Sequence, residues 1–277
     1  MTKTRVLFVS QEITPYLPEN PLSKTARELP QAIQEKGREI RTFMPRYGCI
    51  NERRNQLHEV IRLSGMNLIV DDNDQPLIIK VASIQAARMQ VYFIDNEEFF
   101  QRKFVISDKS KKFYADNDER MLFFCKGVIE TVKKLGWSPD VIHCHGWMAA
   151  LLPALIKKKY IDDPLFSDSK VIVSLYNDKF NETMDHRLAE KLMLDGIDAT
   201  DVAAIKEPTY ENLMKYAIAH ADGVIVADES VDNALTAHAK SLKKDTLENF
   251  NNEDQADACS NFYDEVLLGE QVAEMAD

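Results

Sequence analysis

The feature that most constrains this chain is an alternation of short apolar runs with amphipathic stretches along most of its 277 residues. Runs such as 5–10 ("RVLFVS") and 170–177 ("KVIVSLYN") are rich in Val, Ile and Leu, which is typical of strands buried on both faces. Between such runs, apolar residues recur every three or four positions, which is the period of a helix packed on a core. This alternation favours a parallel sheet covered by helices, so we predict a doubly wound α/β fold.

The first half begins with a strand, a helix and a second strand. The run 5–10 is followed by a helical pattern over 22–33 that ends at Gly37, and 39–48 is typical of the next strand. The middle third differs, because it holds strand-like runs with no long helix among them. We expect a hairpin or meander there, inserted in or attached to the main sheet, with strands over 58–65, 76–84 and 89–95.

Helices and strands alternate clearly in the second half. A helical pattern begins after Asp116, whose side chain can cap the helix, and it ends at Gly136. The elements predicted after it are strand 140–146, helix 147–159, strand 170–177, helix 209–221 and strand 223–228.

Length and composition indicate the domain organisation. A chain of 277 residues fits one large domain or two modest ones, and it can bury roughly three quarters of its unfolded surface. We assign residues 1–240 to a single α/β domain. Residues 241–277 are polar, acidic and rich in Asn, and only 262–275 has an amphipathic pattern, so we expect a helical or partly disordered tail there.

The charge balance excludes several classes of partner. The net charge is -11, whereas binding to nucleic acid or to an anionic membrane requires clustered Lys and Arg. No apolar run approaches the roughly 18 residues that a membrane helix needs, and the start of the chain lacks the pattern of a signal peptide. The four cysteines have no ligand-like spacing. We therefore expect a cytoplasmic protein that binds neither nucleic acid nor membranes.

Candidate ligand sites lie at the carboxyl ends of the predicted strands, where open α/β sheets bind their ligands. The loops there contain no Walker motif, dinucleotide fingerprint or Gly-x-Ser-x-Gly elbow. His143 and His145 lie on the same side of a strand, which would suit zinc if a third ligand came from elsewhere. The alternative is a strand end whose histidines hydrogen-bond to neighbouring loops. We favour that alternative, and we expect no metal and no cofactor, because no other residue has metal-ligand spacing.

Five stretches of the sequence follow the pattern of one enzyme family in the same order. They are "RVLFVSQEITPY" (5–16), "ELPQAIQEKGREIRTFMPRYG" (28–48), "YADNDERMLFF" (114–124), "PDVIHCHGWMAALLPALI" (139–156) and, more loosely, "KYAIAHADGVIVADES" (215–230). On these residues the chain resembles the N-terminal domain of bacterial glycogen synthases and plant starch synthases, glycosyltransferase family 5. The similarity extends over roughly residues 4–235, which makes it more specific than a single motif.

The resemblance implies one Rossmann-like half of a GT-B glycosyltransferase. Enzymes of this family transfer glucose from ADP-glucose or UDP-glucose to an α-1,4-glucan, in a cleft between two such domains and without a metal. The second domain supplies most nucleotide contacts in the family. Only residues 231–277 follow "VADES" here, too few for another domain of that kind. We therefore expect a stand-alone domain, in which the charge that develops on the departing diphosphate would lack its usual stabilisation.

Three loop positions depart from the family pattern. The family has a Lys-Thr-Gly-Gly segment that contacts the sugar nucleotide. In this sequence Pro18 stands in place of that lysine, and Asn20 and Pro21 stand in place of the two glycines. Proline has no N–H to donate to a phosphate, and the close backbone approach that glycine allows is lost. The family's aspartate near the reacting sugar is Gly146 here, and its histidine aligned with the glucose is Tyr176. We therefore assign no catalytic residue.

These departures lead to a hypothesis for the function. We expect a non-catalytic binding or regulatory protein that is inactive as an enzyme on its own, whose exposed cleft holds a protein partner or a glucan. One alternative is a glucosyltransferase that acts only with a partner supplying the second domain. Another is a different small-molecule site on the same scaffold. The candidate cleft-lining residues are Glu12, His145, Tyr176 and Asn177.

The loop that lost the family's lysine and glycines also predicts where the first helix begins. Asn20 is a favourable N-cap residue, since its short side chain can accept a hydrogen bond from the first turn. Pro21 then falls at the first helical position, where its missing N–H has no consequence. We therefore predict a firm helix start at this point.

Overall fold

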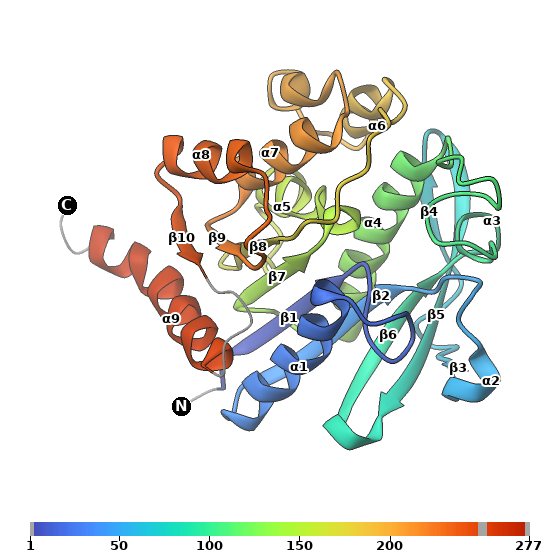
Figure 1. Ribbon diagram of the computed structural model, residues 1–277, viewed down its shortest axis with the longest axis horizontal. Helices are drawn as coiled ribbons and strands as arrows, with labels where there is room; N and C mark the ends of the chain where they lie inside the picture. The colour runs from blue at the N-terminus through green and yellow to red at the C-terminus, as the bar shows by residue number, and fades with distance from the viewer. Residues whose placement is uncertain (1–2, 249–253, 275–277) are drawn as a thin grey trace.

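The protein is represented by a computed structural model that describes residues 3–248 and 254–274 (Figure 1). Its strands are β1 (Arg5–Ser10), β2 (Glu39–Pro45), β3 (His58–Glu59), β4 (Met66–Val70), β5 (Asn73–Ile84), β6 (Met89–Asp95), β7 (Val141–His145), β8 (Lys170–Leu175), β9 (Gly223–Val226) and β10 (Asp245–Glu248). Within the described residues they form one sheet in the order β10-β9-β8-β7-β1-β2-β6-β5-β3, and β4 pairs with β5.

Along the sheet order from β10 to β6, each pair of adjacent strands is parallel. Nearly every residue of β1, β7 and β8 is buried, because helices cover both faces of the sheet. The predicted α/β fold with a mostly parallel sheet is therefore confirmed, and the first strand has its predicted bounds.

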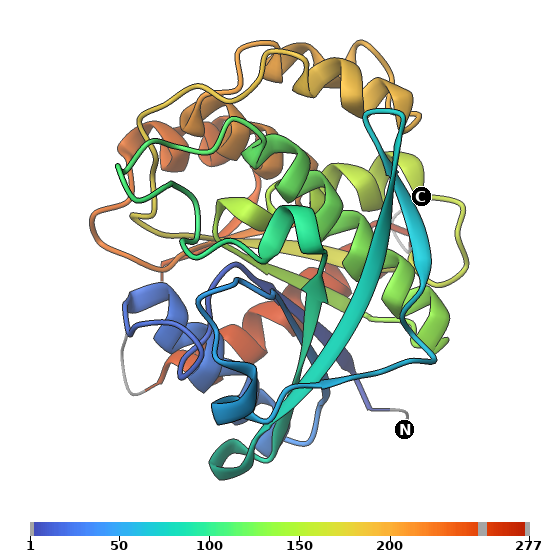
Figure 2. The same ribbon diagram turned by 90° about the vertical axis from the view of Figure 1, so that its right-hand side faces the viewer.

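Two layers of helices enclose the sheet (Figure 2). Helices α1 (Pro21–Glu35) and α9 (Gln255–Glu274) lie on one face, and α4 (Asn117–Leu135), α5 (Leu152–Ala154) and α7 (Tyr210–His220) lie on the other. The remaining helices are α2 (Glu52–Asn55), α3 (Glu97–Phe100), α6 (Leu188–Leu194) and α8 (Asn233–Ser241). Within the ranges that the structure describes, no helix combines the length and the apolar character needed to cross a membrane.

The predicted helix 147–159 is not continuous. A single 3-10 turn (Trp147–Ala149) comes first, α5 follows, and a wider turn covers Leu155–Lys159. Pro153 explains the interruption, because proline lacks the N–H of the regular helical hydrogen bond and its ring crowds the preceding turn. The prediction of one regular helix was therefore wrong in this segment.

The middle third forms the expected antiparallel addition at one edge of the sheet. Strand β5 pairs with β6, β3 and β4, all antiparallel. Strand β4 was missed by the sequence analysis, which placed a strand over 58–65, where only β3 forms. Asp71 and Asp72 make the tight turn between β4 and β5, and both have positive φ angles, of 47° and 60°. Aspartate tolerates this left-handed region better than most residues do.

The predicted start of α1 is confirmed. Asn20 has an extended backbone, its side chain accepts a hydrogen bond from the Ser23 N–H at 2.8 Å, and the Ser23 hydroxyl accepts one from the Asn20 N–H at 2.9 Å. At α4 the N-cap position is Asp116, as predicted, but the side chain does not cap the helix. Its carboxylate instead binds the Arg102 guanidinium through two hydrogen bonds, of 2.7 and 2.5 Å.

Helix α9 and strand β10 belong to the segment after residue 240 that the sequence analysis set apart. The strand extends the parallel sheet beside β9, and the helix packs against α1. Phe262 and Tyr263 of α9 are buried. A Cβ atom added at Gly223 would lie only 2.9 Å from the Phe262 ring, so the helix and the end of the sheet are closely packed.

The packing of α9 leads to a stability prediction. Phe262→Ala should lower the free energy of unfolding by about 3 kcal/mol, because it removes a buried ring and leaves a cavity. Leu268→Ala on the same helix should change it by less than about 0.5 kcal/mol, since that side chain is 53% exposed. Urea unfolding followed by circular dichroism measures both. Equal effects of the two substitutions would contradict a role of α9 in covering the core.

Candidate functional site

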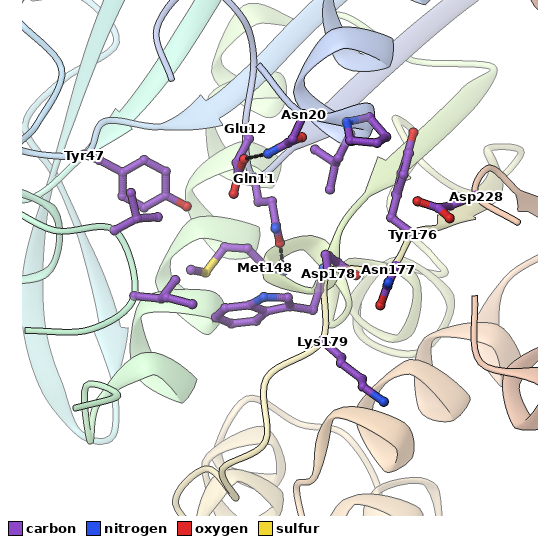
Figure 3. Close-up of a pocket in the computed structure, with 15 residues that line it drawn as sticks. Gln11, Glu12, Asn20, Tyr47, Met148, Tyr176, Asn177, Asp178, Lys179 and Asp228 are labelled. Atoms are coloured by element: carbon purple, nitrogen blue, oxygen red, sulfur yellow. Dashed lines mark hydrogen bonds between the residues drawn. The ribbon is translucent and has the colours of Figure 1, made fainter. Parts of the chain in front are cut away.

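A cavity of about 320 Å³ opens where the carboxyl ends of β1, β7, β8 and β9 meet (Figure 3). The chain order reverses between β1 and β7, because β2 lies on one side of β1 and β7 on the other. Such a switch point is the usual ligand site of an open α/β sheet. Residues that line the cavity include Gln11, Glu12, Asn20, Tyr47, Trp147, Met148, Tyr176, Asn177, Asp178, Lys179 and Asp228.

Three of the four candidate cleft residues lie on the wall of this cavity: Glu12, Tyr176 and Asn177. His145 does not line it, because the imidazole is fully buried in the core. Its Nδ1 atom is hydrogen-bonded to the Tyr176 hydroxyl at 2.8 Å. The structure therefore brings Glu12, Tyr176 and Asn177 together on the cavity wall and places His145 behind Tyr176.

The hydroxyl of Tyr176 is not available to a ligand in the cavity. Its side chain is 3% exposed, and its hydroxyl bonds to the buried His145. Figure 3 shows the ring extending away from Asp178 and Lys179, with the hydroxyl at its far end. At this position, where the resemblance implies a histidine aligned with the glucose, the chain has a tyrosine whose hydroxyl is bonded inside the core.

The space beside Gly146 is filled by Gln11. A Cβ atom at Gly146 would lie 2.5 Å from the Gln11 side-chain carbonyl, and Gln11 Oε1 accepts a hydrogen bond from the Met148 N–H at 3.2 Å. Gly146 also has a φ of 82° and a ψ of 164°, a combination that is essentially restricted to glycine. An aspartate cannot occupy this position without movement of both the backbone and Gln11.

The loop that enters α1 offers few donors to a phosphate. Pro18 is exposed, Pro21 has no N–H, and the Ser23 N–H is already bonded to the Asn20 side chain. The Asn20 side-chain amide donates to Glu12 at 2.5 Å. The Ser23 N–H at the start of the helix is therefore already occupied by the Asn20 side chain, and the Glu12 carboxylate lies next to it.

Carboxylates dominate the charge of the cavity wall. Glu12, Asp178 and Asp228 line it, with Lys179 as the one cation among its lining residues in the described part of the chain. Burial raises the pKa of Glu12. Burial also raises the pKa of Asp178 to about 6, although Asp178 accepts hydrogen bonds from the Tyr210 hydroxyl at 2.7 Å and the Trp147 N–H at 3.1 Å.

Tyr47 is a cavity residue that the sequence analysis did not single out. It is 1% exposed, and its hydroxyl has no hydrogen-bond partner among the described residues. Figure 3 shows that hydroxyl directed toward the cavity. Buried hydroxyls nearly always have a partner, so this group is available to a ligand. Its place near the end of the second predicted strand, 39–48, was the only sequence signal.

The two histidines of β7 are held by hydroxyl groups. His143 Nδ1 bonds to the Tyr263 hydroxyl and Nε2 to the Ser174 hydroxyl, both at 2.7 Å. The two imidazole centroids are 4.0 Å apart. Over the residues that the structure describes, no group of three or more His, Cys, Asp and Glu side chains is arranged to hold a metal ion.

The contact at Gly146 can be tested by a mutant cycle. Gly146→Ala should lower the free energy of unfolding by about 2 kcal/mol or more, through backbone strain and the collision with Gln11. In a Gln11→Ala background the same change should cost about 1 kcal/mol less, because the colliding atoms are gone. Gly196→Ala is the control, since Gly196 also has positive φ but no neighbour within 4 Å. A Gly146 cost that is identical in both backgrounds would contradict the steric explanation.

Burial of the histidines predicts acid sensitivity. Burial lowers the pKa of His145 to about 3, whereas an unfolded histidine has a pKa near 6.5. Below that value the unfolded chain binds a proton that the folded chain does not, so stability falls as pH falls. From pH 7 to pH 5, His145 should account for a loss of about 2 kcal/mol.

Urea unfolding of His145→Gln at the two pH values measures this contribution, which should disappear from the pH dependence of the variant. His186→Gln is the control, because it removes a histidine at an exposed position. An unaltered pH dependence in His145→Gln would contradict the assignment.

Comparison with known proteins connects this geometry to a family. The family described as starch synthase catalytic domain matches residues 5–247. The glycogen synthase of Chlorobium limicola is 34% identical over 235 residues, which are 83% of this chain and 47% of that protein. The glycogen synthase of Chlorobaculum parvum is 31% identical over 270 residues, or 96% of this chain and 52% of that protein. The chain spans about half the length of the curated relatives that it matches.

A solved structure gives the same result for the fold. The catalytic domain of starch synthase IV from Arabidopsis thaliana, bound to ADP and acarbose, superposes with a TM-score of 0.72 over 89% of this chain and 51% of that one, at 18% sequence identity. The cavity described above therefore belongs to a glycogen-synthase-like domain. The chain is a member of the starch synthase catalytic domain family, glycosyltransferase family 5.

Proposed function

We propose that this chain is a non-catalytic binding or regulatory member of its family, whose cavity takes a neutral, hydroxyl-rich ligand such as the end of an α-1,4-glucan. The observation that carries the proposal concerns Gly146 and Tyr176, the two positions at which the resemblance implies a polar residue near the reacting sugar. The Gln11 side chain fills the space beside Gly146, and the Tyr176 hydroxyl is bonded inside the core. Neither position offers a polar group to a reacting sugar.

The charge of the cavity supports a neutral ligand over a sugar nucleotide. A diphosphate approaching Glu12, Asp178 and Asp228 would meet three carboxylates and the single compensating charge of Lys179. Repulsion between like charges is strongest where water is partly excluded, because the effective dielectric constant is lower there. Carboxylates accept hydrogen bonds readily, however, and the hydroxyl groups of a sugar can donate them.

Tyr47 supports the same class of ligand. Its hydroxyl, which has no hydrogen-bond partner among the described residues, is directed at the cavity, and Trp147 also lines the cavity. A few precisely placed polar groups on a largely apolar surface are typical of small-molecule sites. A glucan end offers both hydroxyl groups and an apolar ring face to such a wall.

Calorimetric titration tests the proposal. Malto-oligosaccharides should give saturable binding, and ADP-glucose and UDP-glucose should give none. Tyr47→Phe should weaken oligosaccharide binding about five- to tenfold, which corresponds to the loss of one hydrogen bond of about 1–1.5 kcal/mol. Tyr216→Phe is the matched control, because the Tyr216 hydroxyl is also buried without a partner among the described residues but does not line the cavity.

Two results would contradict the proposal. One is conversion of either sugar nucleotide into glucan by the purified chain. The other is tight binding of a sugar nucleotide without any binding of oligosaccharides. Unchanged oligosaccharide affinity in Tyr47→Phe would remove Tyr47 from the site and leave the ligand class standing.

A second candidate function is favoured by the span of the match. Because the chain matches about half of its curated relatives, a glucosyltransferase completed by a partner that supplies the second domain is the alternative. Mixing the chain with a separately produced C-terminal half of a homologous glycogen synthase tests it. Glucan synthesis by the mixture, and by neither part alone, would support this alternative.

A further inference from the structure

A second concave site lies on the other side of the loop that enters α1. It is a groove of about 590 Å³ between α1, α2 and the turn that joins β5 to β6. In Figure 1 these elements lie together on the side of the molecule below and to the right of β1. We call it the α1–α2 groove. Its lining shares no residue with the cavity at the switch point.

Three cations line this groove, and none has a partner in the part of the chain that the structure describes. Lys24 and Arg27 are one turn apart on α1, and Arg54 is on α2. Within residues 3–248 and 254–274, none of the three forms an ion pair or a side-chain hydrogen bond. Lys24 and Glu28 have the i,i+4 spacing of a helical ion pair, yet no such pair is present. Elsewhere many cations are paired, including three consecutive lysines, 157–159.

The rest of the lining suits an anion attached to a small organic group. Gln56 and Gln85 offer amide donors, and Tyr16 and Ile84 provide buried apolar wall. Arginine binds phosphate oxygens through two parallel hydrogen bonds, and lysine adds a point charge. Glu19 and Glu28 also line the groove; they reduce its local charge from three positive to one, so the phosphate must contact the cations directly.

From these observations we propose that the α1–α2 groove is a binding site for a small phosphomonoester, with Lys24, Arg27 and Arg54 as the phosphate-binding side chains. The groove volume exceeds that of a phosphate ion and falls within the range of small-molecule sites. Because the whole chain carries a net charge of -11, an anion gains nothing from long-range attraction. Binding therefore depends on these local cations and weakens as ionic strength rises.

Calorimetric titration at low ionic strength tests the site, with inorganic phosphate and glycerol 3-phosphate as probes. Wild-type protein should bind both, and the organic ester should bind more tightly because it also contacts the wall. The triple variant Lys24→Gln, Arg27→Gln, Arg54→Gln should lose at least tenfold in affinity. The matched control is Lys109→Gln, Lys111→Gln, Lys112→Gln, which removes the same charge at exposed positions outside the groove and should change affinity less than twofold.

The outcomes distinguish a specific phosphate site in the groove from a nonspecific effect of the protein's net charge. Absence of saturable binding to wild-type protein at tens of millimolar probe would overturn the proposal, and so would an equal loss in both triple variants. Thermal unfolding checks that each variant is folded. If the groove triple is unstable, Arg54→Gln alone, at an exposed position, should still lose about threefold, and an unchanged affinity there would count against the site.

Discussion

Burial of the central strands on both faces is the constraint on which the rest of this structure depends. Every residue of β7 is buried between β1 and β8, so His143 and His145 have no access to water. An unpaired buried polar group is costly, and three of their four ring nitrogens have hydroxyl partners; among the described residues His145 Nε2 has none. Tyr263 of α9 bonds to His143, and Tyr176 bonds to His145. Helix α9 thus contributes a polar partner to the core as well as apolar cover.

The same strand order creates the cavity and leaves its chemistry open to change. The position of the cavity follows from topology. The chain order reverses between β1 and β7, and the loops that follow these two strands diverge there. The chemistry of the cavity follows from a few loop residues that the sheet does not constrain. Gln11 and Gly146 illustrate this: the glycine creates the space and the glutamine fills it, beside the regular parallel pairing of β1 and β7. A family fold can therefore persist while the groups at its site are replaced.

Local signals in the sequence were enough to predict much of the fold. Apolar runs gave the parallel strands, and Asn20 with Pro21 gave the start of α1, because caps and buried strands depend on nearby residues. Strand β4 was missed because the expected strand was placed earlier, over 58–65, and residues 66–70 were assigned to no element.

The candidate site was less predictable, since its members meet only through the sheet. Glu12 and Asn177 could be inferred from strand ends, which lie at one edge of any parallel sheet. Tyr47 reaches the cavity because β2 lies next to β1, a pairing that the sequence analysis did not specify. His145 also ends a strand, yet it is buried behind Tyr176, and the side-chain direction at the last strand residue could not be derived from periodicity.

The two concave sites differ in charge, and this difference has a consequence for ligand choice. Carboxylates dominate the cavity, whereas the α1–α2 groove has an excess of cations. At physiological ionic strength charges are screened beyond about 8 Å, so each site responds mainly to its own side chains. A neutral sugar and a phosphate ester would then bind at different places on one chain. The scarcity of phosphate donors at the cavity therefore does not exclude recognition of a phosphate at the α1–α2 groove.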